Sequence, residues 1–215
     1  IAIYIIQPWK PWIALSKSSL KSLLGFGIPY QLNNFLATFK DDGLTIVLGS
    51  ILGSYGLGIL GTAQKASQYP LRFFMDNVTK VTFPAFSRMQ ADKEALGKSL
   101  EKSIFFICSL VFPSLVGLVI LFPTIIAVVP SYQKWEPAFL PLIFLSVSAL
   151  IASFTTQFTN LLNSVGKIKT TFKLMVMWTT LSWLLIPFLS KRLGVEGAAL
   201  GYLLVGLSSF VVLYI

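Results

Sequence analysis

Six apolar stretches, each close to the length of a membrane span, follow one another along this chain with only short polar connections between them. About twenty predominantly apolar residues suffice for an α-helix to cross the hydrocarbon core of a bilayer. The sequence therefore predicts an all-α, polytopic membrane helix bundle with six transmembrane helices. The predicted spans cover residues 25–52, 57–83, 104–129, 138–162, 170–189 and 197–215.

The connections between these spans contain residues that favour turns. Gly53 to Gly56 separates the first two spans, and Gly194 to Gly197 separates the last two. Gly197 and Gly201 also form a small-xxx-small pattern, which is typical of closely packed membrane helices. The predicted organisation has two parts: residues 1–24 as the end of a preceding helix with a cytoplasmic interfacial linker, and residues 25–215 as the six-helix lobe.

The composition supports a membrane protein and argues against an enzyme. The chain is 55% hydrophobic and only 12% charged, whereas soluble domains carry about 25% charged residues. It contains no histidine, which removes the commonest general base and metal ligand, and one cysteine, Cys108. We therefore predict no catalytic residues, no metal site and no cofactor.

The distribution of lysine and arginine predicts the orientation of the spans. These residues concentrate before the first span, after the second and after the fourth. Because cytoplasmic connections carry an excess of Lys and Arg, both ends of the chain are predicted to be cytoplasmic. This bias, together with contacts to membrane lipids, explains the net charge of +9 without a nucleic-acid partner.

Charged residues inside the first two predicted spans are the strongest indication of function. A charge at the bilayer centre costs about 2.5–3.5 kcal/mol on insertion scales, so such residues normally face a bundle interior or a hydrated cavity. The two spans carry six of them: Lys40, Asp41, Asp42, Lys65, Arg72 and Asp76. The sequence therefore predicts that something polar is bound or moved within the membrane.

The second span places its polar residues on one side. At 100° per residue they occupy a stripe about 100° wide on the helix surface. The stripe consists of Lys65, Gln68, Tyr69, Arg72 and Asp76. These side chains are the candidate binding surface of the span.

Two arrangements of the charged residues are compatible with the sequence. Arg72 and Asp76 are four residues apart and can pair on consecutive turns. Lys65 could then pair with Asp41 or Asp42 across the bundle, or with an anionic substrate. In one arrangement all six charges form a closed ion-pair network that fixes helix register. In the other they line a hydrated cavity.

Several motifs resemble those of a known family. The chain contains SLLGFGIPYQLNNFLATFKDD, then IVLGSILGSYGLGILGTAQKASQYPLRFF and VTFPAFSRMQAD, and later LVFPSLVGLVIL and LGVEGAALGYLL. Their order and spacing resemble the O-antigen and exopolysaccharide unit flippases (Wzx/PST-like proteins) of the MOP exporter superfamily. The resemblance covers essentially the whole chain. The run Lys40-Asp41-Asp42 is more charged than the Asn/Asp usual at this point in the family.

The resemblance implies an architecture and an activity. Such proteins have two six-helix lobes around a cationic cavity, and this chain would be a fragment containing the second, C-terminal lobe of a MOP/MATE-like transporter. They flip undecaprenyl-diphosphate-linked oligosaccharides across the bacterial inner membrane by alternating access. The implied partners are the lipid-linked oligosaccharide, membrane lipids, the N-terminal lobe of the same chain and a glycan polymerase.

The resemblance also suggests roles for the candidate residues. Lys40, Lys65 and Arg72 match positions at which family members carry polar or basic cavity residues. Lys65 and Arg72 would hold the diphosphate because cations replace its lost hydration. Gln68 and Tyr69 would line the same cavity. A coupling proton or cation would be carried by an acidic residue, with Asp41, Asp42 and Asp76 as the candidates.

Two other functions remain as alternatives. An ion-coupled drug or cation antiporter of the related MATE-like branch would depend on Asp41 or Asp76 rather than on the basic residues. A membrane glycan polymerase or ligase would need a large extracytoplasmic loop. The short outer connections argue against that second alternative.

Overall fold

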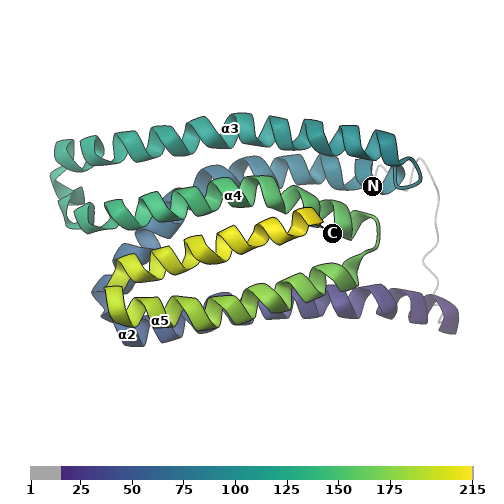
Figure 1. Ribbon diagram of the computed structural model, residues 1–215, viewed down its shortest axis with the longest axis horizontal. Coiled ribbons are helices and arrows are strands. Elements are labelled where there is room, and N and C mark those ends of the chain that lie inside the picture. The colour runs from purple at the N-terminus through teal and green to yellow at the C-terminus, as the bar shows by residue number, and fades with distance from the viewer. Residues whose placement is uncertain (1–15, 215) are drawn as a thin grey trace, which may run out of the picture.

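The computed structural model describes residues 16–214, and the secondary structure in that part of the chain is helical throughout. Four helices are long and apolar enough to cross a membrane. In chain order the elements are α2 (Lys17–Arg88), α3 (Lys93–Val128), the 3₁₀ helix η1 (Pro130–Ala138), α4 (Phe139–Ser164), α5 (Ile168–Ser208) and the 3₁₀ helix η2 (Ser209–Tyr214). The helices lie roughly along one axis (Figure 1). The predicted all-α membrane helix bundle is confirmed.

Helices α2 and α5 are each interrupted at one glycine. Gly53 has φ 68° and ψ 177°, and Gly194 has φ 62° and ψ −137°. Residues with a side chain rarely adopt a positive φ with an extended ψ, whereas glycine does so readily. The chain reverses direction at both breaks (Figure 1). Each break lies within a turn that the sequence predicts, at residues 53–56 and 194–197.

The two halves of α5 pack closely through glycines of the second half. A Cβ atom on Gly201 would lie 3.0 Å from the Cα atom of Ile186, and one on Gly197 would collide with the carbonyl oxygen of Leu189. Small residues allow helix backbones to approach in this way. The expectation of close packing at Gly197 and Gly201 is confirmed.

Two helices, α2 and α3, begin well before the predicted spans. Helix α3 starts at Lys93 rather than near residue 104, because Asp92 caps it by accepting hydrogen bonds from the backbone N–H groups of Glu94 and Ala95, each at 3.0 Å. Residues 17–24 of the predicted interfacial linker form the first turns of α2. The rest of that linker, residues 1–15, lies outside the described residues. Apolar length marks the membrane-spanning part of a helix, whereas polar caps determine where the helix starts.

The largest cluster of buried apolar side chains joins all the long helices. It includes Leu48 and Leu60 from the two halves of α2, Leu142 from α4, and Ile186 and Ala198 from the two halves of α5. A second cluster packs α3 against the second half of α2 and against α4. The lobe is therefore held together along its whole width.

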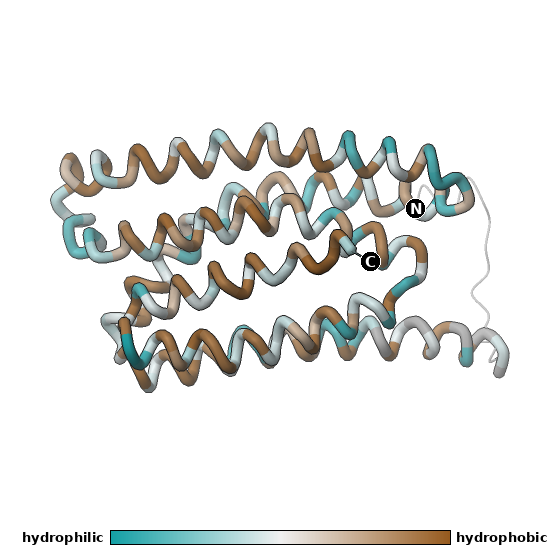
Figure 2. The backbone as a smooth tube through the Cα atoms, in the orientation of Figure 1, coloured by the Kyte–Doolittle hydropathy of each residue, from teal (hydrophilic) through white to brown (hydrophobic). Residues whose placement is uncertain are grey.

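The outer surface of the bundle is also strongly apolar. Ile46 is 75% exposed and Phe105 is 74% exposed. Apolar residues run along the middle of the helices, whereas the most hydrophilic residues gather near the two ends of the bundle (Figure 2). This pattern matches a bundle whose sides contact lipid and whose ends contact water.

The connections predict a labelling pattern that tests the orientation. Residues 89–92 and 165–167 lie at one end of the bundle, and η1 lies at the other (Figure 1). In the full-length protein with Cys108 and any other native cysteine replaced, we expect cysteines at Ala91 or Lys167 to react with a membrane-impermeant maleimide only after cells are permeabilised. A cysteine at Ser131 should react in intact cells. The reverse pattern would show that the lobe has the opposite orientation.

The close packing within α5 predicts the effect of adding one methyl group. Gly197→Ala should lower the thermal unfolding midpoint of the purified full-length protein by several degrees, because overpacking costs about 1–3 kcal/mol. Gly117→Ala is the matched control, since a Cβ atom there meets nothing within 4 Å. That control should keep or raise the midpoint, because alanine is favoured over glycine in a helix. Equal midpoints for the two variants would contradict the packing at Gly197.

Candidate functional site

The polar stripe of the second half of α2 lies on an exposed face of the lobe. Its five members, Lys65, Gln68, Tyr69, Arg72 and Asp76, are all exposed, and Tyr69 is 71% exposed. The opposite side of this half-helix is apolar and packs through Met75 against α3 and α4. The helical periodicity that the sequence indicates is therefore present in the structure.

The charged run of the first half of α2 is divided between a partly buried and an exposed environment. The side chain of Lys40 is 21% exposed and that of Asp41 is 65% exposed. The Lys40 Nζ atom lies 3.4 Å from the Asp41 Oδ1 atom. Asp42 is exposed. Lys40 is thus the charge of this run that points into the bundle.

The ion pairs that the sequence allowed, Arg72 with Asp76 and Lys65 with Asp41 or Asp42, are not present among the described side chains. Among the side chains that the structure describes, the ion pairs within 4.0 Å are Lys40–Asp41 and Lys98–Glu94. Arg72 and Asp76 are not paired, although their spacing permits it. Both side chains are exposed, and exposed pairs gain little because water screens their charges. A closed network of the six charges is therefore not formed by the described residues.

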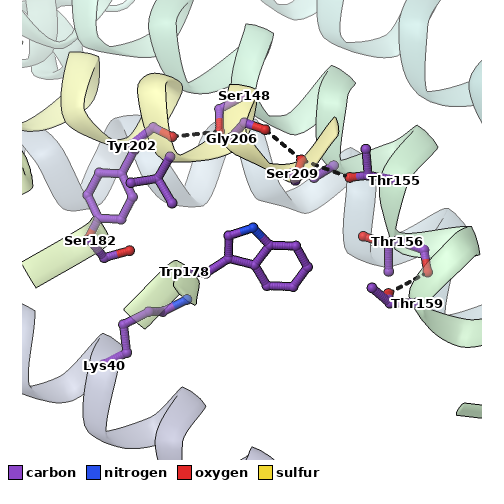
Figure 3. Close-up of a pocket in the computed structure, with 12 residues that line it drawn as sticks. Lys40, Ser148, Thr155, Thr156, Thr159, Trp178, Ser182, Tyr202, Gly206 and Ser209 are labelled. Carbon is purple, nitrogen blue, oxygen red and sulfur yellow. Dashed lines mark hydrogen bonds between the residues drawn. The ribbon is translucent and has the colours of Figure 1, made fainter. Parts of the chain in front are cut away.

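Lys40 lines a cavity of about 320 Å³ between the first half of α2, α4, both halves of α5 and the start of η2. We call it the Lys40 cavity, and Figure 3 shows its side chains. Most of the other lining residues carry hydroxyl groups or are small. They are Ser148, Ala152, Thr155, Thr156, Thr159, Trp178, Ser182, Tyr202, Val205, Gly206 and Ser209.

Arg72 lines a second cavity of about 280 Å³ on the side of the second half of α2. We call it the Arg72 cavity. Its lining combines four polar residues of α2, including Arg72, with a wall from α4 and α5. The full set is Gln64, Ser67, Gln68, Leu71, Arg72, Leu145, Ser148, Ala149, Ala152 and Tyr202.

The two cavities adjoin each other across a shared wall. Ser148, Ala152 and Tyr202 line both of them. The Ser148 hydroxyl donates a hydrogen bond of 3.3 Å to the backbone carbonyl of Tyr202, which links α4 to the second half of α5. Lys40 and Arg72, from the two halves of α2, therefore lie on opposite sides of one wall.

Not every predicted site residue belongs to this pair of cavities. Lys40, Gln68 and Arg72 do, whereas Lys65 and Tyr69 line neither cavity. Asp41, Asp42 and Asp76 also line neither of them. These remaining residues lie on exposed faces of α2 next to the cavities.

Sequence reasoning missed the contribution of α4 and α5 to the site. Trp178 and Tyr202 line the Lys40 cavity together with hydroxyl groups of α4 such as Thr155 and Thr156. One signal could have indicated α4: Ser153 to Asn160 reads SFTTQFTN, a polar run within a predicted span. No comparable signal marks Trp178 or Tyr202.

A metal site is not evident in the described part of the chain. No three His, Cys, Asp or Glu residues of residues 16–214 lie close enough to hold a metal ion together. The polar groups of the two cavities are hydroxyls, amides, cations and the indole N–H of Trp178. Such groups suit an oxygen-rich or anionic ligand better than a cation.

Three proteins similar to this chain match nearly all of it. Lipopolysaccharide biosynthesis protein WzxC of Escherichia coli (strain K12) is 27% identical over 206 residues, which are 96% of this chain and 42% of WzxC. A membrane protein of the cps region of Klebsiella pneumoniae is 23% identical over 193 residues, 90% of this chain and 40% of that protein. A membrane protein of Methanocaldococcus jannaschii is 25% identical over 198 residues, 88% of this chain and 44% of that protein.

The chain thus spans less than half the length of these relatives. No solved structure matches it significantly. The model of the polysaccharide biosynthesis protein family matches residues 1–140, more than half of the chain. This chain therefore belongs to the polysaccharide biosynthesis protein family, which confirms the resemblance that its motifs indicated.

Proposed function

We propose that this chain is part of a transporter that flips lipid-linked oligosaccharide units across the bacterial inner membrane by alternating access. The main support for this proposal is the environment of Arg72. Its guanidinium group lies at a cavity with Gln64 and Gln68, and no carboxylate of the described residues pairs with it. Family membership supports a role in handling polysaccharide precursors.

An unpaired arginine at such a cavity suits a diphosphate. A diphosphate that crosses hydrocarbon loses its hydration and needs charge-assisted hydrogen bonds in exchange. The planar guanidinium group of Arg72 can bind two phosphate oxygens at once, and the ammonium group of Lys65 adds a second charge on the same face. Gln68 and Tyr69 offer neutral polar contacts beside them.

The remaining parts of the proposal concern coupling and partners. Asp42 and Asp76 are exposed and form no ion pair within the described residues, so either could carry a coupling proton or cation. Asp41, paired with Lys40 at 3.4 Å, is a third candidate. The exposed stripe of α2 would face the N-terminal lobe, which completes the cavity in the whole protein. Translocation by this route requires no catalytic residues, so we propose a transporter rather than an enzyme.

Arg72→Ala should abolish surface glycan export. The test uses the full-length parent gene in cells whose own flippase is deleted, with surface glycan and protein abundance measured together. Because Arg72 is exposed and unpaired, its loss should leave protein abundance unchanged. Arg88→Ala is the matched control, since Arg88 is an exposed arginine on the same helix outside both cavities. If Arg72→Ala and Arg88→Ala export glycan equally well, Arg72 does not bind the diphosphate.

The same cells distinguish the proposal from an ion-coupled antiporter. We expect Lys65→Ala to reduce export by about tenfold, because a hydrogen bond to a charged group contributes roughly 1.5–3 kcal/mol. Lipid-linked units should then accumulate at the cytoplasmic face. An antiporter would give the opposite result, with activity kept in Lys65→Ala and Arg72→Ala and lost in Asp41→Asn or Asp76→Asn.

A further inference from the structure

Most hydroxyl groups of the Lys40 cavity already have hydrogen-bond partners. The Thr155 hydroxyl bonds the carbonyl of Ile151 at 3.0 Å and lies 3.1 Å from the Ser209 hydroxyl. The Thr159 hydroxyl donates to the carbonyl of Thr156 at 2.8 Å. These groups still have lone pairs free to accept a further hydrogen bond.

Two buried polar groups of the same cavity, the Trp178 indole N–H and the Ser182 hydroxyl, make no hydrogen bond with the described residues. The Trp178 Nε1 atom is buried and makes no hydrogen bond. Ser182 is only 2% exposed, lines the cavity, and its hydroxyl has no partner among residues 16–214. A buried donor that is left unpaired costs about 1–3 kcal/mol. Such a cost is usually recovered when a ligand or an ordered water occupies the site.

The chemistry of these groups restricts the ligand. The indole N–H and the ammonium group of Lys40 can only donate hydrogen bonds. No carboxylate lines the cavity, so a cationic ligand would approach the Lys40 ammonium directly, while Asp41, 3.4 Å from the Lys40 Nζ atom, lies outside the lining. A phosphate group in this cavity would have only one cationic side chain, Lys40, to balance its charge. The cavity instead favours a neutral or acidic ligand with many oxygen acceptors and some hydroxyl donors.

The shape of the cavity restricts the ligand further. Lys40 extends from α2 toward the indole ring of Trp178, and hydroxyl-bearing side chains of α4, α5 and η2 lie beside the ring (Figure 3). The volume of about 320 Å³ is at the lower end of the 300–1,000 Å³ range of small-molecule sites. It suits one sugar ring, with the indole ring as the apolar surface and the hydroxyl groups around it.

We propose that the Lys40 cavity is a binding site for one pyranose residue of the glycan. Trp178 would pack against the sugar ring and donate its N–H group to a sugar oxygen. Ser182 would exchange a hydrogen bond with a sugar hydroxyl, and Lys40 would bind a ring substituent oxygen or the carboxylate of an acidic sugar. The proposal rests on the proposed function only in assigning the sugar to the transported glycan.

The test measures protection of a cysteine placed in the cavity. Ser182→Cys, in the purified full-length protein with its other cysteines replaced, is reacted with a small thiol reagent. The probes are free glucose, galactose, N-acetylglucosamine, glucuronate and galacturonate, with acyclic mannitol as the control. We expect at least one pyranose to slow the reaction several-fold and mannitol to leave it unchanged. Thr180→Cys, at an exposed position on the same helix outside the cavity, should react at the same rate with and without each of these sugars.

A matched pair of tryptophan variants tests the role of the indole N–H. Trp178→Phe keeps an aromatic ring but removes the donor. Trp183→Phe is the control, because Trp183 also has an unpartnered Nε1 atom but stacks on Phe39 at 5.5 Å outside the cavity. Trp178→Phe should weaken sugar protection about fivefold, as expected for one lost hydrogen bond, and lower glycan export per protein. Trp183→Phe should change neither.

The outcomes separate this inference from the proposed function. If no pyranose protects Ser182→Cys and the two tryptophan variants export equally, the sugar site is disproved and water fills the cavity. The proposed function would still stand if Arg72→Ala abolishes export. If pyranoses protect the cysteine but the wild-type protein exports no glycan, the sugar site stands and the proposed cargo is wrong.

Discussion

The close contact between the two halves of α5 determines where both cavities lie. Because Gly197 and Gly201 have no side chains, the second half of the helix packs directly against the first. That contact holds Tyr202 beside Ser148 of α4, and the 3.3 Å hydrogen bond between them ties the two helices together. Both residues line both cavities, so the polar interior of the lobe depends on this packing.

The bilayer explains why polar groups concentrate at these cavities. Hydrocarbon offers no partner for a hydroxyl group or a charge, so such groups face the interior or pair with the backbone. The Thr155 and Thr159 hydroxyls do pair with carbonyls of α4. Lys40 and Arg72 instead face the two cavities, where they can bind an anionic or oxygen-rich ligand. In a poorly hydrated cavity such electrostatic interactions are stronger than in bulk water.

Much of the helical architecture could be predicted from the sequence. Apolar length located the helices, and glycine-containing turns located the breaks at Gly53 and Gly194. The start of α3 could not be obtained from hydropathy, because the Asp92 cap and a polar first turn extend the helix beyond its apolar part. Possible pairing of Arg72 with Asp76 followed from spacing alone. It is absent because both side chains are exposed and gain little from pairing.

The sequence by itself determined that the chain is helical, that it suits a membrane, and that the polar residues of α2 share one face. These properties depend on composition and on the 3.6-residue period within a single helix. Only the tertiary structure decided that Lys40 lies with Trp178 and Ser182 of α5, and that Tyr202 separates it from Arg72. Contacts between helices depend on how their surfaces interlock. Residues distant in sequence therefore form one site through packing that no local pattern encodes.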